Sequence, residues 1–171
     1  MPDFKTTISF NGRDYDTLGD ILPKTPKPID ILFIAKTPAI QSVETGHYFQ
    51  GKQGQMFWKK LKDYNILQTR PNTYEDENLL ENNFGITDIV KIPRNFGNEP
   101  SNDEYKMGLD RIKAIIKKHK PQIIIFVYKK VLDKILKHGF QITQKSKYGF
   151  NKDFEEIFQS KVFVFPMPGT P

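Results

Sequence analysis

The side chains best suited to chemistry lie mainly in three segments, each of which directly follows a predicted buried strand. These segments are residues 36–52, 91–101 and 166–171. In an open parallel sheet, ligands bind in the crevice at the carboxyl ends of the strands, so we expect the segments to converge on one rim. The first is seventeen residues long, and long loops in compact domains are commonly functional. Its polar and aromatic side chains include Thr37, Ser42, His47, Tyr48 and Phe49.

Several common kinds of catalytic or metal site have no signature in this chain. The sequence contains no G-x-G-x-x-G, G-x-x-x-x-G-K-[ST] or G-x-S-x-G motif. It has no cysteine, which excludes disulfides, thiol nucleophiles, zinc fingers and iron–sulfur clusters. The three histidines, His47, His119 and His138, are scattered along the chain. We therefore expect neither a metal nor a cofactor.

Composition favours a soluble protein with an anionic partner. The 26 lysines and arginines exceed the 20 acidic residues, which gives a net charge of +6 and points towards nucleic acid. Aromatic residues form 13% of the 171 residues, a share that excludes a disordered chain. The longest apolar run, residues 123–128, is too short to cross a membrane, and the N-terminus lacks the apolar region of a secretion signal. We expect a cytoplasmic monomer that binds DNA and no membrane.

The hydrophobic pattern alternates between strands and helices. Apolar runs predict buried strands at residues 29–35, 85–90, 122–127 and 162–165. The spacing predicts helices at 54–64, from 101 to about 120 and at 129–137, with a helical stretch at 74–80. Ser101 and Glu104 form the capping box of the clearest helix, and His138-Gly139 is the expected cap of the last.

This alternation is typical of an α/β protein, a three-layer α/β/α sandwich around a central, mainly parallel four-stranded sheet. The length corresponds to one domain, residues 1–171. Residues 1–28 form an N-terminal lead-in with a short alternating stretch at 7–10 and a helical turn at 18–22, followed by three prolines.

Several segments together resemble the uracil-DNA glycosylase superfamily. The sequence ILFIAKTPAIQSVETG at residues 31–46, with Phe49 and the pair Phe57-Trp58, is similar to its first motif, nearest to the mismatch-specific uracil/thymine branch. In that branch a strand ends in a G-x-N-P-G-type turn, followed by Ser, Thr-Gly, a base-stacking Phe and a Phe-Trp pair. The resemblance continues through GITDIVK at 85–91 and KPQ at 120–122 to VFPMPG at 164–169, which resembles the second motif. It spans residues 29–171.

The resemblance implies roles for individual residues. Phe49 would stack on a flipped base, Thr37 would face the attacked sugar carbon, and the backbone from Gly46 to Phe49 would contact the base edge. His47 and Tyr48 would line the site, while Ser42 would bond either the nucleotide or its own loop. Lys91 and Arg94 would contact phosphates. Four residues of the second motif would press on the DNA backbone or fill the gap that the flipped base leaves: Met167, Pro168, Gly169 and Thr170.

The chain departs from the family at both motifs. Thr37 replaces the usual first-motif Asn, and a hydroxyl lacks the paired donor and acceptor of an amide. Met167 replaces the second-motif Asn or His, so it cannot bond a uracil carbonyl strongly. Some branches use a carboxylate or amide elsewhere. Asp88, near the end of the second predicted strand, is the best substitute and our candidate catalytic residue.

Three functions remain open at this point. The first is a monofunctional DNA glycosylase that hydrolyses the N-glycosidic bond of uracil or another deaminated base by base flipping and water attack. The second is a catalytically weak or inactive module of the same fold that binds DNA or a nucleotide. The third is an unrelated small-molecule enzyme. The retained Thr45-Gly46 and Phe49 favour the first, and the replacements at Thr37 and Met167 favour the second.

Overall fold

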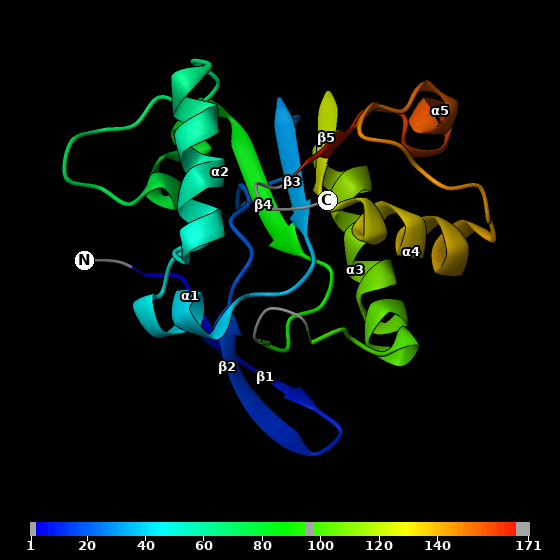
Figure 1. Cartoon of the computed structure of the whole chain (residues 1–171), viewed down its shortest axis with the longest axis horizontal. Coiled ribbons are helices and arrows are strands. Elements are labelled where there is room, and N and C mark those ends of the chain that lie inside the picture. The colour runs from blue at the N-terminus through cyan, green and yellow to red at the C-terminus, as the bar shows by residue number, and fades with distance from the viewer. Residues whose placement is uncertain (1–2, 95–97, 167–171) are drawn as a thin grey trace.

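The computed structural model of the chain describes residues 3–94 and 98–166. Its central sheet has five strands in the order β4-β3-β5-β7-β6, and Figure 1 shows β4, β3 and β5 side by side. Four of them run parallel: β3 (Ile31–Ala35), β4 (Phe84–Asp88), β5 (Ile123–Val127) and β7 (Lys161–Phe165). The fifth, β6 (Gly149–Phe150), pairs antiparallel with β7. The predicted fold class is confirmed, but the predicted strand number was wrong because a two-residue edge strand carries no detectable pattern.

Helices cover both faces of this sheet. On one face, α3 (Asn102–His119) and α4 (Lys129–Phe140) share a hydrophobic core with the alternate strand residues Leu32, Ile34 and Ile124. On the other, α2 (Lys52–Asp63) contributes Phe57 to a second core with Phe33. The short helix α5 (Glu155–Phe158) lies against β7. The result is the predicted three-layer arrangement (Figure 1).

Several element boundaries differ from the prediction. The loop after β3 contains a short helix, α1 (Ile40–Thr45), whose six residues are too few for a clear periodicity. Helix α4 continues through the expected His138-Gly139 cap to Phe140, and Gln141 adopts the left-handed conformation instead. The Ser101 capping box of α3 is confirmed, since its Oγ accepts from Glu104 N at 3.2 Å. The described part of the chain also has three short 3-10 turns, at Glu75–Asn78, Leu80–Asn82 and Lys152–Phe154.

The N-terminal lead-in is more ordered than its sequence indicates. It forms a hairpin of β1 (Lys5–Phe10) and β2 (Arg13–Leu18), so the predicted helical turn at 18–22 was wrong. After β2 the chain runs along the edge of the main sheet, where Ile21 exchanges two backbone hydrogen bonds with Ile86 of β4 at 3.1 and 3.0 Å. This path brings Asp20 beside the end of β4, where Thr87 Oγ1 donates to its Oδ1 at 2.6 Å.

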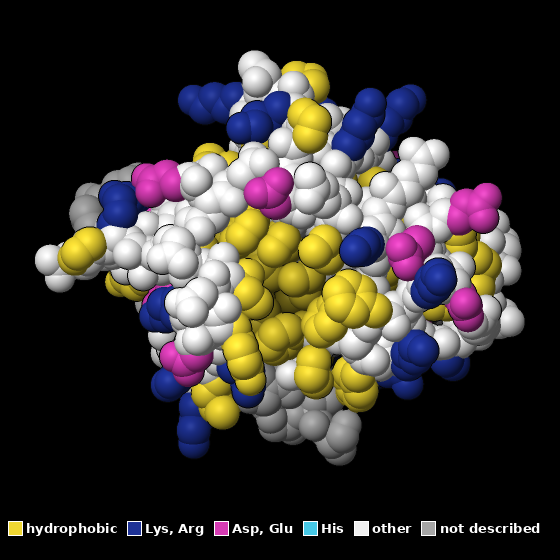
Figure 2. Space-filling model, turned by 90° about the horizontal axis from the view of Figure 1, so that it is seen from above, with side chains coloured by type: hydrophobic (Ala, Val, Ile, Leu, Met, Phe, Trp, Pro, Cys, Tyr) yellow, Lys and Arg dark blue, Asp and Glu magenta, His cyan; other side chains and the backbone are white. Residues whose placement is uncertain are grey.

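Hydrophobic side chains gather in a hollow on the side of the molecule seen in Figure 2, with charged side chains around its rim. Among the residues that the structure describes, no helix is both long enough and apolar enough to cross a membrane.

Candidate active site

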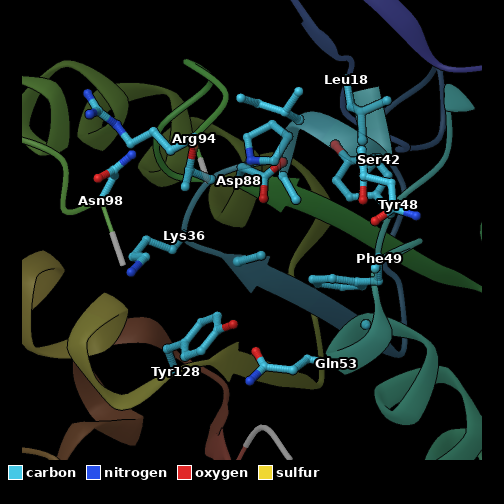
Figure 3. A pocket seen from close by; sticks show the side chains of 18 of the residues that line it. Leu18, Lys36, Ser42, Tyr48, Phe49, Gln53, Asp88, Arg94, Asn98 and Tyr128 are labelled. Carbon is cyan, nitrogen blue, oxygen red and sulfur yellow. The ribbon is translucent and has the colours of Figure 1, made fainter. Parts of the chain in front are cut away.

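A cavity of about 430 Å³ lies where β3, β4 and β5 end (Figure 3). The segments after β3 and β4 meet there, as predicted: Arg94 N donates to Pro38 O at 3.0 Å. The third segment begins at Pro166, directly after β7, and its residues 167–171 lie outside the described residues. The first two segments therefore converge on one rim of the sheet.

Asp88, the last residue of β4, places a buried carboxylate in the wall of this cavity. The residue is 1% exposed, and its Oδ2 has no hydrogen-bond partner among the described residues. Lys91 Nζ lies 3.7 Å from that oxygen. Burial raises the pKa of Asp88 to about 6, although the charges of Lys91 and Arg111 favour its ionised form. Such a carboxylate is ionised at neutral pH and can accept a proton from water.

Asp88 lies beside a network of ion pairs formed by Asp20, Lys91 and Arg111. Lys91 Nζ lies 2.7 Å from Asp20 Oδ1 and donates to Tyr48 Oη at 3.1 Å. Arg111 donates to Asp20 Oδ2 at 3.1 Å and to the backbone oxygen of Asp88 at 2.5 Å. Only 11% of the Lys91 side chain is exposed. This position does not suit the phosphate contact predicted for Lys91, because such a contact would leave a buried carboxylate unpaired.

Thr37 lies in the turn directly after β3 and also lines the cavity. Its hydroxyl donates to the backbone oxygen of Ile92, which ties this turn to the segment after β4. A second bond, from Ile89 N to Ala35 O at 2.9 Å, joins the ends of β3 and β4 just before these segments. The donated hydrogen is therefore engaged, but the hydroxyl oxygen retains acceptor capacity for a water.

Phe49 forms part of the cavity wall and of an aromatic cluster. Its ring contacts Phe57 edge to face at 4.8 Å between centroids and Trp58 at 5.6 Å. Its backbone has a φ of +57°, and the first turn of α2 approaches it closely at Gly54. A Cβ on Gly54 would lie 2.6 Å from Phe49 Cα, so the absence of a side chain there permits this arrangement.

Ser42 and Tyr48 line the cavity, whereas His47 and Gly46 do not. Of the two roles left open for Ser42, the structure has the bond to its own loop, since its Oγ accepts from Gln50 N at 3.0 Å. His47 is buried, and its Nδ1 lies 2.8 Å from an oxygen of Asp76.

The Asp76 carboxylate also fixes the loop on which Tyr48 lies. Tyr48 N donates to its second oxygen at 2.8 Å, and burial raises the pKa of Asp76 to about 6. His47 stacks on Tyr74 at 3.7 Å between ring centroids. Gly46 ends α1 with a φ of +83°. The geometry thus gives His47 and Gly46 positions behind the loop, away from the substrate contact predicted for them.

Arg94 lines the cavity and forms an ion pair with Glu104, the capping-box residue of α3. Its Nε is buried and has no hydrogen-bond partner among the described residues. The predicted contacts of the second motif lie outside those residues; they are Met167, Pro168, Gly169 and Thr170.

Comparison with known families agrees with this arrangement. A family model described as the uracil DNA glycosylase superfamily matches residues 22–170. The chain belongs to this superfamily. The match covers the strands of the main sheet and both segments that meet at the cavity. Among the described residues that line the cavity, Asp88 is the one that carries a carboxylate.

Sequence reasoning gave no role to six polar residues that line the cavity, which bring two ammonium groups, a phenol and three amides: Lys36, Lys52, Tyr128, Gln41, Gln53 and Asn98. Lys36 and Tyr128 directly follow β3 and β5, so the rule that ligands bind at the carboxyl ends of parallel strands was sufficient to find them. The same rule does not reveal Gln53, which depends on where α2 begins.

Proposed function

We propose that this protein is a monofunctional DNA glycosylase, which hydrolyses the N-glycosidic bond of uracil or another deaminated base in DNA. The observation that carries this proposal is the Asp88 carboxylate, which is buried in the wall of a cavity that Phe49 also lines and whose pKa is raised to about 6. Membership of the superfamily supports the substrate class. Within the superfamily, the motifs at residues 31–46 favour the mismatch-specific uracil/thymine branch.

The proposed reaction begins with a nucleotide flipped out of the duplex into the cavity. As the bond between the base and the sugar breaks, positive charge develops on the sugar and negative charge on the base. Asp88 accepts a proton from a water that attacks the sugar carbon, and its negative charge stabilises the cationic sugar. The proton then passes to the departing base, so the products are a free base and an abasic site. The Thr37 hydroxyl oxygen accepts a hydrogen bond from the same water and so helps to hold it in place.

Base binding in this proposal combines stacking with polar contacts. The ring of Phe49 is held by Phe57 and Trp58 and stacks on the flipped base. Gln53 and Asn98 bring amide groups to the cavity, and an amide can both donate to and accept from a base edge.

Basic side chains at the cavity provide the contacts to DNA. Lys36, Lys52 and Arg94 line it, and Lys52 is exposed at the start of α2. Lys36 and Arg94 also pair with glutamates, but unlike Asp88 these carboxylates keep another hydrogen bond: Glu99 from Tyr105 Oη and Glu104 from Ser101 N, each at 2.6 Å. Such groups neutralise phosphates on either side of the flipped nucleotide and release counterions. They replace Lys91 in the role that the sequence suggested for it.

The test is an abasic-site assay with duplexes that contain uracil, hypoxanthine or a mismatched thymine, followed by alkaline cleavage of the strand. We expect catalytic turnover on at least one of these duplexes and none on an undamaged control. Binding of the same duplexes without cleavage would replace this proposal with the binding-module alternative.

A further inference from the structure

Tyr128 has a backbone conformation that disfavours any side chain. Its φ is +103° and its ψ is 131°, at the junction between β5 and α4. The other non-glycine residues with positive φ in the described chain have φ values between 38° and 60°, the range of the left-handed helical region, which side chains adopt uncommonly and asparagine most often. Glycine adopts the conformation of Tyr128 readily, whereas other residues are strained there. A tyrosine at this position therefore reduces the stability of the fold.

The side chain of Tyr128 enters the cavity from the β5 side. Figure 3 shows its ring across from Phe49, with Gln53 beside it. Lys36 Nζ lies 5.4 Å from the ring centroid and 3.3 Å from Glu99 Oε2, so the ring is held by a cation that is itself paired. Burial raises the pKa of the Tyr128 hydroxyl, which keeps this group neutral. Strained residues that persist at a cavity are commonly retained for function.

We propose that Tyr128 determines which base the cavity accepts, by restricting it to single-ring bases and excluding purines. This inference rests on the proposed function and extends it to substrate selection. Phe49 supplies one wall of the cavity, and the Tyr128 ring, which lies across from it in Figure 3, narrows the space left for a base. Discrimination by such a steric obstacle does not require extra contacts with the preferred base. The strain at Tyr128 is then the cost of this selectivity.

Two variants separate selection from simple packing. Tyr128→Gly removes the ring and the strain together, whereas Tyr128→Phe keeps the ring and removes only the hydroxyl. We expect Tyr128→Gly to raise kcat/KM for hypoxanthine relative to uracil by about tenfold or more, as for other pockets in which added bulk discriminates. Tyr128→Phe should keep the wild-type ratio. Relief of the backbone strain offsets part of the stability that is lost with the packing of the ring and through the gained freedom of a glycine in the unfolded chain, so Tyr128→Gly should remain folded, which its melting curve checks.

A lower melting temperature with an unchanged ratio would overturn the inference, because Tyr128 would then serve packing alone. The affinities of wild type and Tyr128→Gly for duplexes with 2′-fluoro nucleotides, which resist hydrolysis, test base selection without requiring cleavage. They therefore distinguish failure of this inference from failure of the proposed function. If wild type cleaves neither duplex but Tyr128→Gly gains affinity for the hypoxanthine duplex about tenfold, hydrolysis is wrong and the selection stands. If neither cleavage nor lesion-specific binding occurs, both proposals are wrong.

Discussion

Lys91 Nζ lies 2.7 Å from Asp20 Oδ1 but 3.7 Å from Asp88 Oδ2, so one buried ammonium group serves two carboxylates unequally. Burial opposes ionisation of both acids, yet Lys91 and Arg111 hold the pKa of Asp20 below its ordinary value. For Asp88 burial prevails, and its pKa rises to about 6. The closer pairing of Lys91 with Asp20 leaves the Asp88 carboxylate, in the wall of the cavity, only partly neutralised.

Glycosylase activity should depend on the ionisation of Asp88. A base must be deprotonated, and the raised pKa means that the ionised fraction falls once the pH drops below about 6. We expect kcat/KM to be constant from pH 7 to 8 and to fall about tenfold per pH unit below 6. Single-turnover rates between pH 4.5 and 8 measure this limb, with melting curves to confirm that the protein remains folded. A rate unchanged between pH 5 and 7 would exclude Asp88 as the base.

Replacing Lys91 should shift the decrease in kcat/KM at low pH to a higher pH. Lys91→Met removes a positive charge that favours ionised Asp88, so the apparent pKa should increase by about one unit or more. The groups that remain near Asp88 are Asp20, which opposes ionisation, Arg111, which favours it, and the buried Tyr48 hydroxyl. Lys59→Met, on the exposed face of α2, makes the same change in net charge and should leave the profile unchanged. Equal profiles for the two variants would contradict the assigned role of Lys91.

Gly54→Ala should impair activity through Phe49. The new Cβ would lie 2.6 Å from the Phe49 backbone, so the stacking ring must move. We expect kcat/KM to fall about 10–100-fold, the usual effect of a misplacement of about 1 Å at an active site. Gly51→Ala is the matched control, because its Cβ would have Gln41 Oε1 as an ordinary neighbour at 3.8 Å. Similar losses in both variants would mean that the position of Phe49 is not important.

DNA affinity should depend strongly on salt and on lysines near the cavity. Lys52→Gln should lower the slope of log Kd against log salt by about one unit, because one phosphate contact is lost. Lys117→Gln is the control, since the last turn of α3 lies at the amino ends of the strands, where Ile29 N bonds His119 O at 2.9 Å. Fluorescence anisotropy with a labelled uracil duplex gives both slopes. If Lys117→Gln lowers the salt slope as much as Lys52→Gln, the contacts with DNA phosphates are not concentrated at the cavity.

The sequence predicted the elements whose patterns are local. Continuous apolar runs identified the four parallel strands, and Ser101 with Glu104 identified the start of α3, because both signals lie within a few residues. The position of Asp88 at the end of β4 followed from the same pattern.

Pairings between distant residues were not predictable from the sequence. Lys91 looked like a surface cation because its partner Asp20 belongs to the N-terminal lead-in, whose path along β4 has no local signal. His47 was predicted to line the site for a similar reason. Its partner Asp76, which holds the imidazole away from the cavity, lies on a distant segment of the chain and has no local signal. The backbone strain at Tyr128 depends on how β5 joins α4, which the residue types do not reveal.

The central claim is that Asp88 activates the attacking water while Thr37 only assists. The most direct measurement is the single-turnover rate of abasic-site formation on the best-cleaved duplex, compared among wild type, Asp88→Ala and Thr37→Ala. Removing the activating carboxylate should lower the rate about 10²–10⁴-fold, and removing the assisting hydroxyl should lower it much less. Circular dichroism and duplex affinity serve as controls for folding and binding. Folded Asp88→Ala protein that cleaves at nearly the wild-type rate would contradict the account.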